Sequence, residues 1–205
     1  MILRVAAALS LLLGAAGLLG FLHVVGKGPF ASAAARHLRA MKDRVAAPDA
    51  VADYAFADFA ALPHHGPLAE YAAVERRGVR LQGYVQHLLS ASDGDLHLEV
   101  AAGPAVPEWP NAVYVTSEIT PQWQRGSDAW AYDPLVAALR PPSGGATPWD
   151  AGARRVRVSG WLLYDYQYDL PQGPAQPRLT GWEIHPVTRI ELWDDSLATF
   201  VEYRR

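Results

Sequence analysis

The stretch VRLQGYVQHLL, residues 79–89, alternates between apolar and polar side chains. Val79, Leu81, Gly83 and Val85 occupy every second position, with charged, amide or aromatic residues between them. A period of two predicts a β-strand with one buried face. Gly83, in the middle of this strand, predicts a bulge or a sharp bend of the kind that barrel strands use at corners.

Four further segments carry the same pattern, and they set the fold class. The polar turn SDGD, residues 92–95, joins the first strand to the second and predicts a hairpin. DPLVAALR, residues 133–140, has an N-cap aspartate and an early proline, which predict a short helix in the long connection. Three strands, a helix and two strands form the element order of the OB-fold, so we predict a mainly β protein with a small five-stranded OB-like Greek-key barrel and one or two short helices. The four segments are LHLEV (96–100), NAVYVTSEI (111–119), RRVRVSGWLLYD (154–165) and WEIHPVTRIELW (182–193).

The composition fits one globular core with an appendage. The chain has 205 residues, of which 50% are hydrophobic and 19% charged, and it has no cysteine. The absence of cysteine excludes a disulfide framework, a thiolate nucleophile and a thiolate metal site. Charge is uneven, because residues 1–45 carry six Lys or Arg and one acidic residue, whereas residues 46–205 carry 12 Arg and 20 acidic residues, a net charge of −8.

The N-terminus is strongly apolar from Val5 to Leu22. A run of this length can span a bilayer as a helix, so we predict a transmembrane anchor over residues 1–26. A cleaved signal peptide ending near ASA, residues 31–33, is the alternative. We further expect a basic and helical lead-in over 27–77, the barrel over 78–195 and a C-terminal tail over 196–205.

The short N-terminal tail with Arg4 is typical of an export signal, which places the protein in the bacterial inner membrane as a single-pass protein with a periplasmic domain. The basic residues after the apolar run, Lys27, Arg36, Arg39, Lys42 and Arg44, favour the opposite orientation.

Two motifs carry a family resemblance. VRLQGYVQHLLSASDGDLHLEV (79–100) contains D-G-D-x-H, and GWEIHPVTRIEL (181–192) contains E-I-H-P-V. With VYVTSEITPQW (113–123) and VRVSGWLLYD (156–165), these segments resemble an uncharacterised bacterial OB-fold-like domain family that pairs the D-G-D-x-H hairpin with a terminal E-[IL]-H-P-V strand. The resemblance covers roughly residues 75–195. It implies an OB-like barrel, sometimes attached to an export signal, and no particular chemistry.

The same motifs supply the candidate metal ligands Asp95, His97, Glu183 and His185. Two imidazoles and two carboxylates suit zinc or manganese, provided that barrel curvature brings the hairpin and the last strand together. A metal-dependent hydrolase would then be reasonable. Alternatively, these residues are solvent-facing or hydrogen-bonded pairs that fix local geometry. We predict no other cofactor. The remaining histidines, His64, His65 and His87, are expected at the surface.

Aromatic and arginine residues suggest a ligand face. We predict a membrane-anchored binding or accessory module, not an enzyme, with an unidentified protein or oligosaccharide as its ligand. Binding of single-stranded nucleic acid is a further alternative, which the net charge of −8 disfavours. No nucleophile-elbow, P-loop or dinucleotide motif is present, and no catalytic residue is assigned. The predicted ligand-binding residues are Tyr84, Tyr114, Trp161, Arg80 and Arg157.

Overall fold

The computed structural model describes residues 31–104, 113–139, 154–170, 173–174 and 178–204. The chain divides into two compact units, residues 1–41 and 42–205. The described part of the first unit is residues 31–41, which form most of helix α2 (Ala33–Lys42). The predicted anchor, residues 1–26, lies outside the described residues. Among the residues that are described, no helix has the length and apolar character needed to cross a bilayer.

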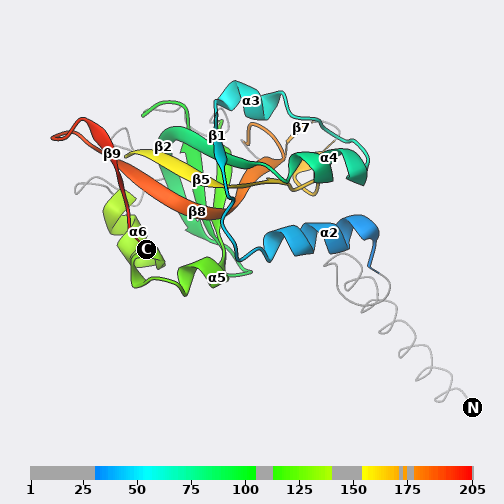
Figure 1. Cartoon of the computed structure of the whole chain (residues 1–205), viewed down its shortest axis with the longest axis horizontal. Helices are drawn as coiled ribbons and strands as arrows, with labels where there is room; N and C mark the ends of the chain where they lie inside the picture. The colour runs from blue at the N-terminus through cyan, green and yellow to red at the C-terminus, as the bar shows by residue number, and fades with distance from the viewer. Residues whose placement is uncertain (1–30, 105–112, 140–153, 171–172, 175–177, 205) are drawn as a thin grey trace, which may run out of the picture. The chain divides into compact units, whose positions relative to one another are not determined.

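The second unit is built on a closed five-stranded barrel, which confirms the mainly β, OB-like prediction (Figure 1). The strands follow one another around the barrel in the order β2-β3-β4-β8-β5, and β5 pairs back to β2. Strands β4 and β8 are parallel, and the other barrel pairs are antiparallel. This is the strand order of an OB-type Greek key. The strands are β2 (Gly78–Ser90), β3 (Leu96–Ala101), β4 (Val115–Ile119), β5 (Arg155–Tyr164) and β8 (Trp182–Asp194).

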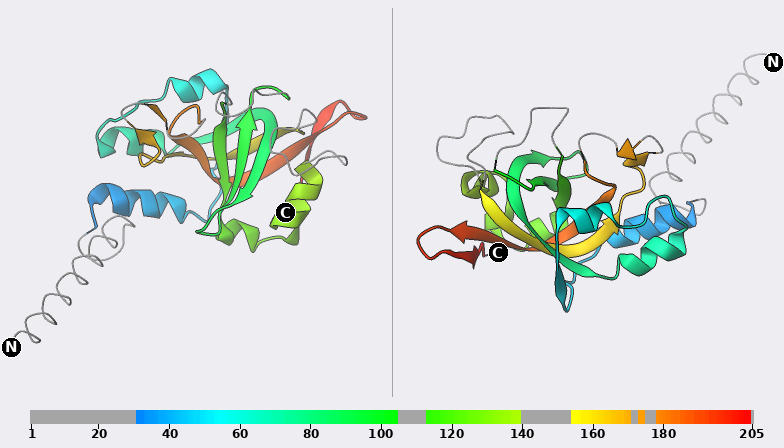
Figure 2. Two further views of the ribbon diagram at one scale, coloured as in Figure 1. Left: turned by 180° about the vertical axis from the view of Figure 1, so that it is seen from behind. Right: turned by 90° about the horizontal axis from the view of Figure 1, so that it is seen from above.

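Segments predicted as a lead-in and a tail add strands to this sheet. Strand β1 (Val51–Tyr54) pairs in parallel with β2, and β9 (Thr199–Glu202) pairs antiparallel with the end of β8. The β8–β9 hairpin projects from the barrel (Figures 1 and 2). Strands β6 (Asp169–Leu170) and β7 (Gly173–Pro174) form a separate small ribbon in the connection between β5 and β8.

Short helices complete the unit and exceed the one or two predicted. Helices α3 (Phe56–Ala60) and α4 (Leu68–Val74) precede the barrel. The connection after β4 holds α5 (Pro121–Gln124), the 3-10 helix η1 (Asp128–Trp130) and α6 (Tyr132–Leu139). Each of these last three buries an apolar residue, namely Trp123 in α5, Trp130 in η1 and Leu135 in α6.

The hydrophobic core fills the barrel, as the period-two pattern predicts. Val79, Leu81, Leu98 and Ile184 are fully buried. Gly83 permits a close approach, because a Cβ atom there would lie 2.6 Å from the carbonyl oxygen of Ala101. The bulge itself lies further along β2, where the register with β3 shifts between residues 85 and 87.

A second irregularity lies where β5 meets β8. The register between the two strands shifts on both sides of Gly160, and a Cβ atom at Gly160 would clash with the carbonyl oxygen of Pro186. The His185–Pro186 peptide bond is cis. Pro186 therefore lies at the irregularity that a proline within a strand predicts, directly after the candidate ligand His185.

Candidate metal centre

Polar side chains line the outer face of the barrel wall formed by β3, β4 and β8. On this wall, His97 is directly opposite Glu118, and Glu99 is opposite Thr116. Strand β8 joins β4 through the pairing of Ser117 with Ile184. Because side chains alternate between the faces of a strand, Glu118 and the polar residues of β8 project to the same side. Asp95 joins them from the turn before β3. We call this set the wall cluster, and its members are Asp95, His97, Glu99, Glu118, Glu183 and His185.

The wall cluster is buried, although polar residues on a barrel exterior are ordinarily expected in solvent. Glu183 and His185 are 0% exposed and Glu118 is 2% exposed. Two basic side chains contribute to this cover: Arg178 contacts Glu183 at 3.0 Å, and Lys42 contacts the buried carboxylate of Asp165 at 3.0 Å. The predicted polar face therefore exists, but it is enclosed.

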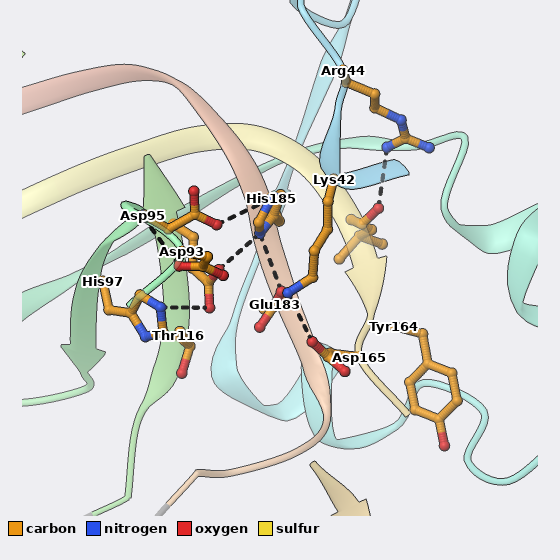
Figure 3. A network of polar contacts seen from close by, with 12 residues as sticks. Lys42, Arg44, Asp93, Asp95, His97, Thr116, Tyr164, Asp165, Glu183 and His185 are labelled. Carbon is orange, nitrogen blue, oxygen red and sulfur yellow. Dashed lines mark hydrogen bonds and ion pairs between the residues drawn. The ribbon is translucent and has the colours of Figure 1, made fainter. Parts of the chain in front are cut away.

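His185 lies at the centre of the wall cluster (Figure 3). Its Nδ1 atom is 3.0 Å from Glu118 Oε2 and 3.3 Å from Glu183 Oε1, and its Nε2 atom is 3.8 Å from Asp95 Oδ2. On the other side of Glu118, the Oε1 atom is 3.3 Å from His97 Nε2. The structure thus brings all four predicted metal ligands together, with Glu118 between them.

The contacts of His185 at these distances are not well-formed hydrogen bonds. Neither ring nitrogen of His185 has a hydrogen-bond partner of good geometry, and the same is true of Glu118 Oε2 and Glu183 Oε1. Leaving a buried polar atom unpaired costs about 1–3 kcal/mol, so four such atoms side by side require an explanation. Atoms that bind a shared cation would lack such hydrogen bonds, because each directs a lone pair to the cation and not to its neighbour; of the two His185 nitrogens, one can be such a ligand.

The electrostatics show an excess of negative charge. Burial raises the pKa of Asp95 to about 7, partly offset by His185, and burial raises the pKa of Glu99 to about 8. Burial alone would lower the pKa of His185, but its contacts with Glu118 and Glu183 prevail and raise that pKa to about 10. The pKa of Glu118 is lowered, because its contacts with His185 outweigh the effect of burial. Without a bound cation, the wall cluster therefore takes up protons.

A divalent ion fits three of these residues best. One potential ligand atom each from Asp95, Glu118 and His185 lies within 4.8 Å of the others. Glu183 contacts Nδ1 of the His185 ring, as Glu118 does, whereas Asp95 is nearest to Nε2. With Nε2 bound to the ion, a carboxylate at Nδ1 would orient the imidazole. Sequence reasoning missed Glu118. The sequence did contain a sign of it: Glu118 shares the polar face of the predicted third strand with Thr116, and the same two-residue period identified the other polar positions.

The predicted ligand-binding residues divide between two faces. Arg80, Tyr84, Arg157 and Trp161 lie on the outer face of the β2–β5 pair, whereas Tyr114 is buried beside Arg178 at the start of the wall. The polar groups of two of them, Arg80 and Trp161, are engaged within the chain. Arg80 pairs with Asp53 at 2.6 Å and 2.9 Å, and the Trp161 ring nitrogen donates to a backbone carbonyl. Trp161 also borders an open pocket of about 390 Å³.

A second histidine–carboxylate group lies around the ribbon strand β6. Asp169 Oδ2 accepts hydrogen bonds from the Tyr164 hydroxyl at 2.5 Å and from His64 Nδ1 at 2.8 Å. The hydroxyl of Tyr164 in turn accepts from the backbone N–H of His65 at 2.9 Å. We call His64, His65, Tyr164 and Asp169 the loop cluster. The side chains of His64 and His65 are 32% and 51% exposed, near the surface as expected.

Comparison with known proteins adds little to this geometry. No protein-family model matches the chain, and no curated protein matches it. Among solved structures, asparaginyl-tRNA synthetase from Entamoeba histolytica shares 15% identity, with a TM-score of 0.37 over 70% of this chain and 24% of that one. Aspartyl-tRNA synthetase from the same organism shares 12% identity, with a TM-score of 0.31 over 70% of this chain and 25% of that one. The chain thus spans about a quarter of these proteins. The resemblance to the uncharacterised bacterial domain family stays a prediction.

Proposed function

We propose that this chain is an OB-type binding module built around a divalent metal centre, with Asp95, Glu118 and His185 as ligands. The observation that carries the proposal is that one potential ligand atom each from the buried residues Asp95, Glu118 and His185 lies within 4.8 Å of the others, while Glu118 and His185 have buried atoms without a well-formed hydrogen bond. Buried polar atoms are nearly always satisfied, and a cation would bind one ligand atom from each of Asp95, Glu118 and His185.

The charge balance supports the same conclusion. Four carboxylates of the wall cluster and the adjacent Asp165 face two fixed cations, Arg178 and Lys42. Burial alone would lower the pKa of Lys42, yet the surrounding acids, Glu183 foremost, raise it. An excess of buried negative charge is costly unless it is paired or coordinates a metal. One nitrogen and two oxygen ligands suit zinc or manganese.

A metal-dependent hydrolase is the second candidate function. The observation in its favour is the number of ligands, because three protein ligands leave a coordination position for water, as in catalytic zinc sites. A metal-bound water with a lowered pKa would attack an ester or phosphodiester. Hydrolysis of p-nitrophenyl acetate or bis-p-nitrophenyl phosphate that requires both the metal and Glu118 would establish this activity. A loaded protein that hydrolyses neither would leave the metal centre with a binding or structural role.

The metal centre is tested on the full chain purified without a histidine tag. We expect near-stoichiometric zinc or manganese by mass spectrometry, and after chelation we expect either ion to raise the melting temperature. Asp95→Asn and Glu118→Gln keep side-chain shape and should abolish both effects. Glu191→Gln, on β8 but outside the wall cluster, is the matched control and should retain them. A wild-type protein that binds neither ion would refute the proposal.

Membrane attachment is a separate part of the proposal and rests on the apolar run from Val5 to Leu22. We propose that this run holds the protein in the bacterial inner membrane with the barrel in the periplasm. The full chain should then resist extraction by alkaline carbonate, whereas a chain lacking residues 1–26 should be extracted. A reporter fused after Arg205 would report the side of the membrane. Extraction of the full chain would contradict anchoring and leave the metal centre untouched.

A further inference from the structure

A row of stacked arginine and aromatic side chains crosses the opposite side of the barrel. The guanidinium of Arg157 lies over the ring of Phe200 at 4.1 Å, and that of Arg155 lies over the rings of Trp193 and Phe200 at 4.5 Å and 5.3 Å. Trp193 and Phe200 face each other across the β8–β9 hairpin. We call these four residues the arginine–aromatic ladder.

The ladder continues onto β2 and is accessible along its length. Gln82 and Tyr84 of β2 lie directly opposite Arg157 and Arg155 in the register. Tyr84 and all four ladder residues are half-buried, so each exposes part of its side chain. This surface includes two of the predicted ligand-binding residues, Tyr84 and Arg157. It adds Trp193, from the last predicted barrel strand, and Phe200, from the predicted C-terminal tail.

The two ladder arginines differ from their neighbours in charge pairing. Arg80 is neutralised by Asp53, and Arg189 contacts Glu191 and Glu202. In the part of the chain that the structure describes, neither Arg155 nor Arg157 forms an ion pair, and the only side-chain hydrogen bond of Arg157 is a long one of 3.4 Å to Gln82. A guanidinium that stacks on a ring through its plane keeps its N–H edge available for an anion.

The net charge of −8 overstates the repulsion that an anion would meet. In the described parts of residues 46–205, eight acidic residues are buried and only one arginine, Arg178, is buried. The other described residues of this region comprise 10 acidic residues and nine arginines, which nearly cancel. Eight acidic residues are thus enclosed, half of them in the wall cluster, and the described surface of this region is close to neutral overall.

We propose that the arginine–aromatic ladder binds a short stretch of single-stranded nucleic acid, with Arg155 and Arg157 on the phosphates and the rings of Trp193, Phe200 and Tyr84 against the bases. Interleaved aromatic rings and arginines are the arrangement that such strands require, because every base offers a flat face and every linkage a negative charge. An acidic peptide would use the arginines and make no use of the exposed parts of the rings. The site is distinct from the proposed metal centre and does not depend on it.

The test is fluorescence anisotropy of a labelled oligothymidylate with the full chain, measured over a series of salt concentrations. The basic segment of residues 27–45 also attracts polyanions, so the informative quantity is the change in salt dependence on mutation. Arg157→Gln should weaken binding and reduce the slope of log affinity against log salt by roughly 1. Arg189→Gln, a paired arginine on β8, is the matched control and should change neither quantity.

Three further variants separate the contribution of base stacking from the contribution of the arginine charges. Phe200→Ala should weaken binding by about tenfold, because loss of one base stack costs about 1–3 kcal/mol. Arg157→Lys keeps the charge and should restore the salt slope with weaker binding. An affinity that the Arg155→Gln/Arg157→Gln double variant leaves unchanged would overturn the proposal. Equal competition by polyglutamate would also overturn it, in favour of an acidic protein partner.

Discussion

The wall cluster and the loop cluster both combine histidine with carboxylate, yet they satisfy their polar atoms in opposite ways. In the loop cluster, Asp169 accepts directed hydrogen bonds of 2.5 Å and 2.8 Å from Tyr164 and His64. In the wall cluster, His185 is 3.0 Å from Glu118, but its ring nitrogens make no well-directed hydrogen bond. The loop cluster is complete with protein atoms alone, and the wall cluster is not.

Burial makes this difference consequential. His64 and His65 are partly exposed, so water can satisfy any atom that the protein does not. His185 and Glu183 are fully buried, where an unpaired atom bears its full desolvation cost. The comparison indicates that proximity of histidine and carboxylate does not by itself mark a metal site. We propose that unpaired and buried ligand atoms that lie close together do.

The largest expected difference between the clusters is in metal affinity. His185→Ala should lower the affinity for zinc or manganese at least about 100-fold. Loss of a residue that only orients a metal ligand lowers metal affinity by about 10–100-fold, and loss of the ligand itself should lower it further. His64→Ala removes an equivalent side chain from the loop cluster and should leave the affinity unchanged. Calorimetric titration of both variants after chelation measures this. A loss of metal from the His64 variant instead would exchange the roles of the two clusters.

The sequence predicted the barrel because each strand has a local period, and it predicted four members of the wall cluster because their motifs are short and polar. It did not predict Glu118 as a member. The approach of Glu118 to His185 depends on the parallel pairing of β4 with β8, which arises only when the barrel closes. Nor did it predict that the wall cluster is buried. Lys42 and Arg178 contribute to its cover, and both come from segments without the two-residue period of a strand. Tyr114 lies on a different wall from the other predicted ligand-binding residues, because alternation does not say which wall a strand occupies.

The next largest effect is on the pH dependence of stability. The pKa values of Asp95, Glu99 and His185 are all raised, to about 7, about 8 and about 10. Between about pH 6.5 and about pH 8.5, the metal-free native state therefore holds protons that the unfolded chain has released. Its stability should fall as pH rises, by about 1.4 kcal/mol per pH unit for each excess proton.

Metal should reverse this trend, because a bound cation replaces the protons. The rise in melting temperature on adding manganese should be larger at about pH 8.5 than at about pH 6.5. Asp169 of the loop cluster provides no such dependence in this range, since its pKa is lowered by Tyr164 and His64 despite burial. A metal-free protein whose melting temperature is constant or rises across this range would contradict the proton excess in the wall cluster.

A smaller effect is expected from the loop cluster itself. Asp169→Asn retains the shape of the side chain but weakens the hydrogen bonds from Tyr164 and His64, which should cost about 1–3 kcal/mol of unfolding free energy. Metal content should not change. Asp95→Asn is its counterpart in the wall cluster and should abolish metal binding. Urea denaturation combined with metal analysis of the two variants separates the roles, and metal loss from Asp169→Asn would show that the clusters communicate.

The smallest effect sharpens the comparison within the wall cluster. Glu99 lies at its edge and accepts a hydrogen bond of 2.9 Å from the Thr116 hydroxyl. Because its pKa is raised to about 8, chiefly by burial, Glu99 is largely protonated near neutral pH, and a glutamine amide resembles that neutral form. Glu99→Gln should therefore change stability by less than about 1 kcal/mol at about pH 6.5 while reducing the loss of stability towards about pH 8.5. Urea denaturation at the two pH values measures both quantities, and a large loss at the lower pH would mean that Glu99 is ionised and belongs among the metal ligands.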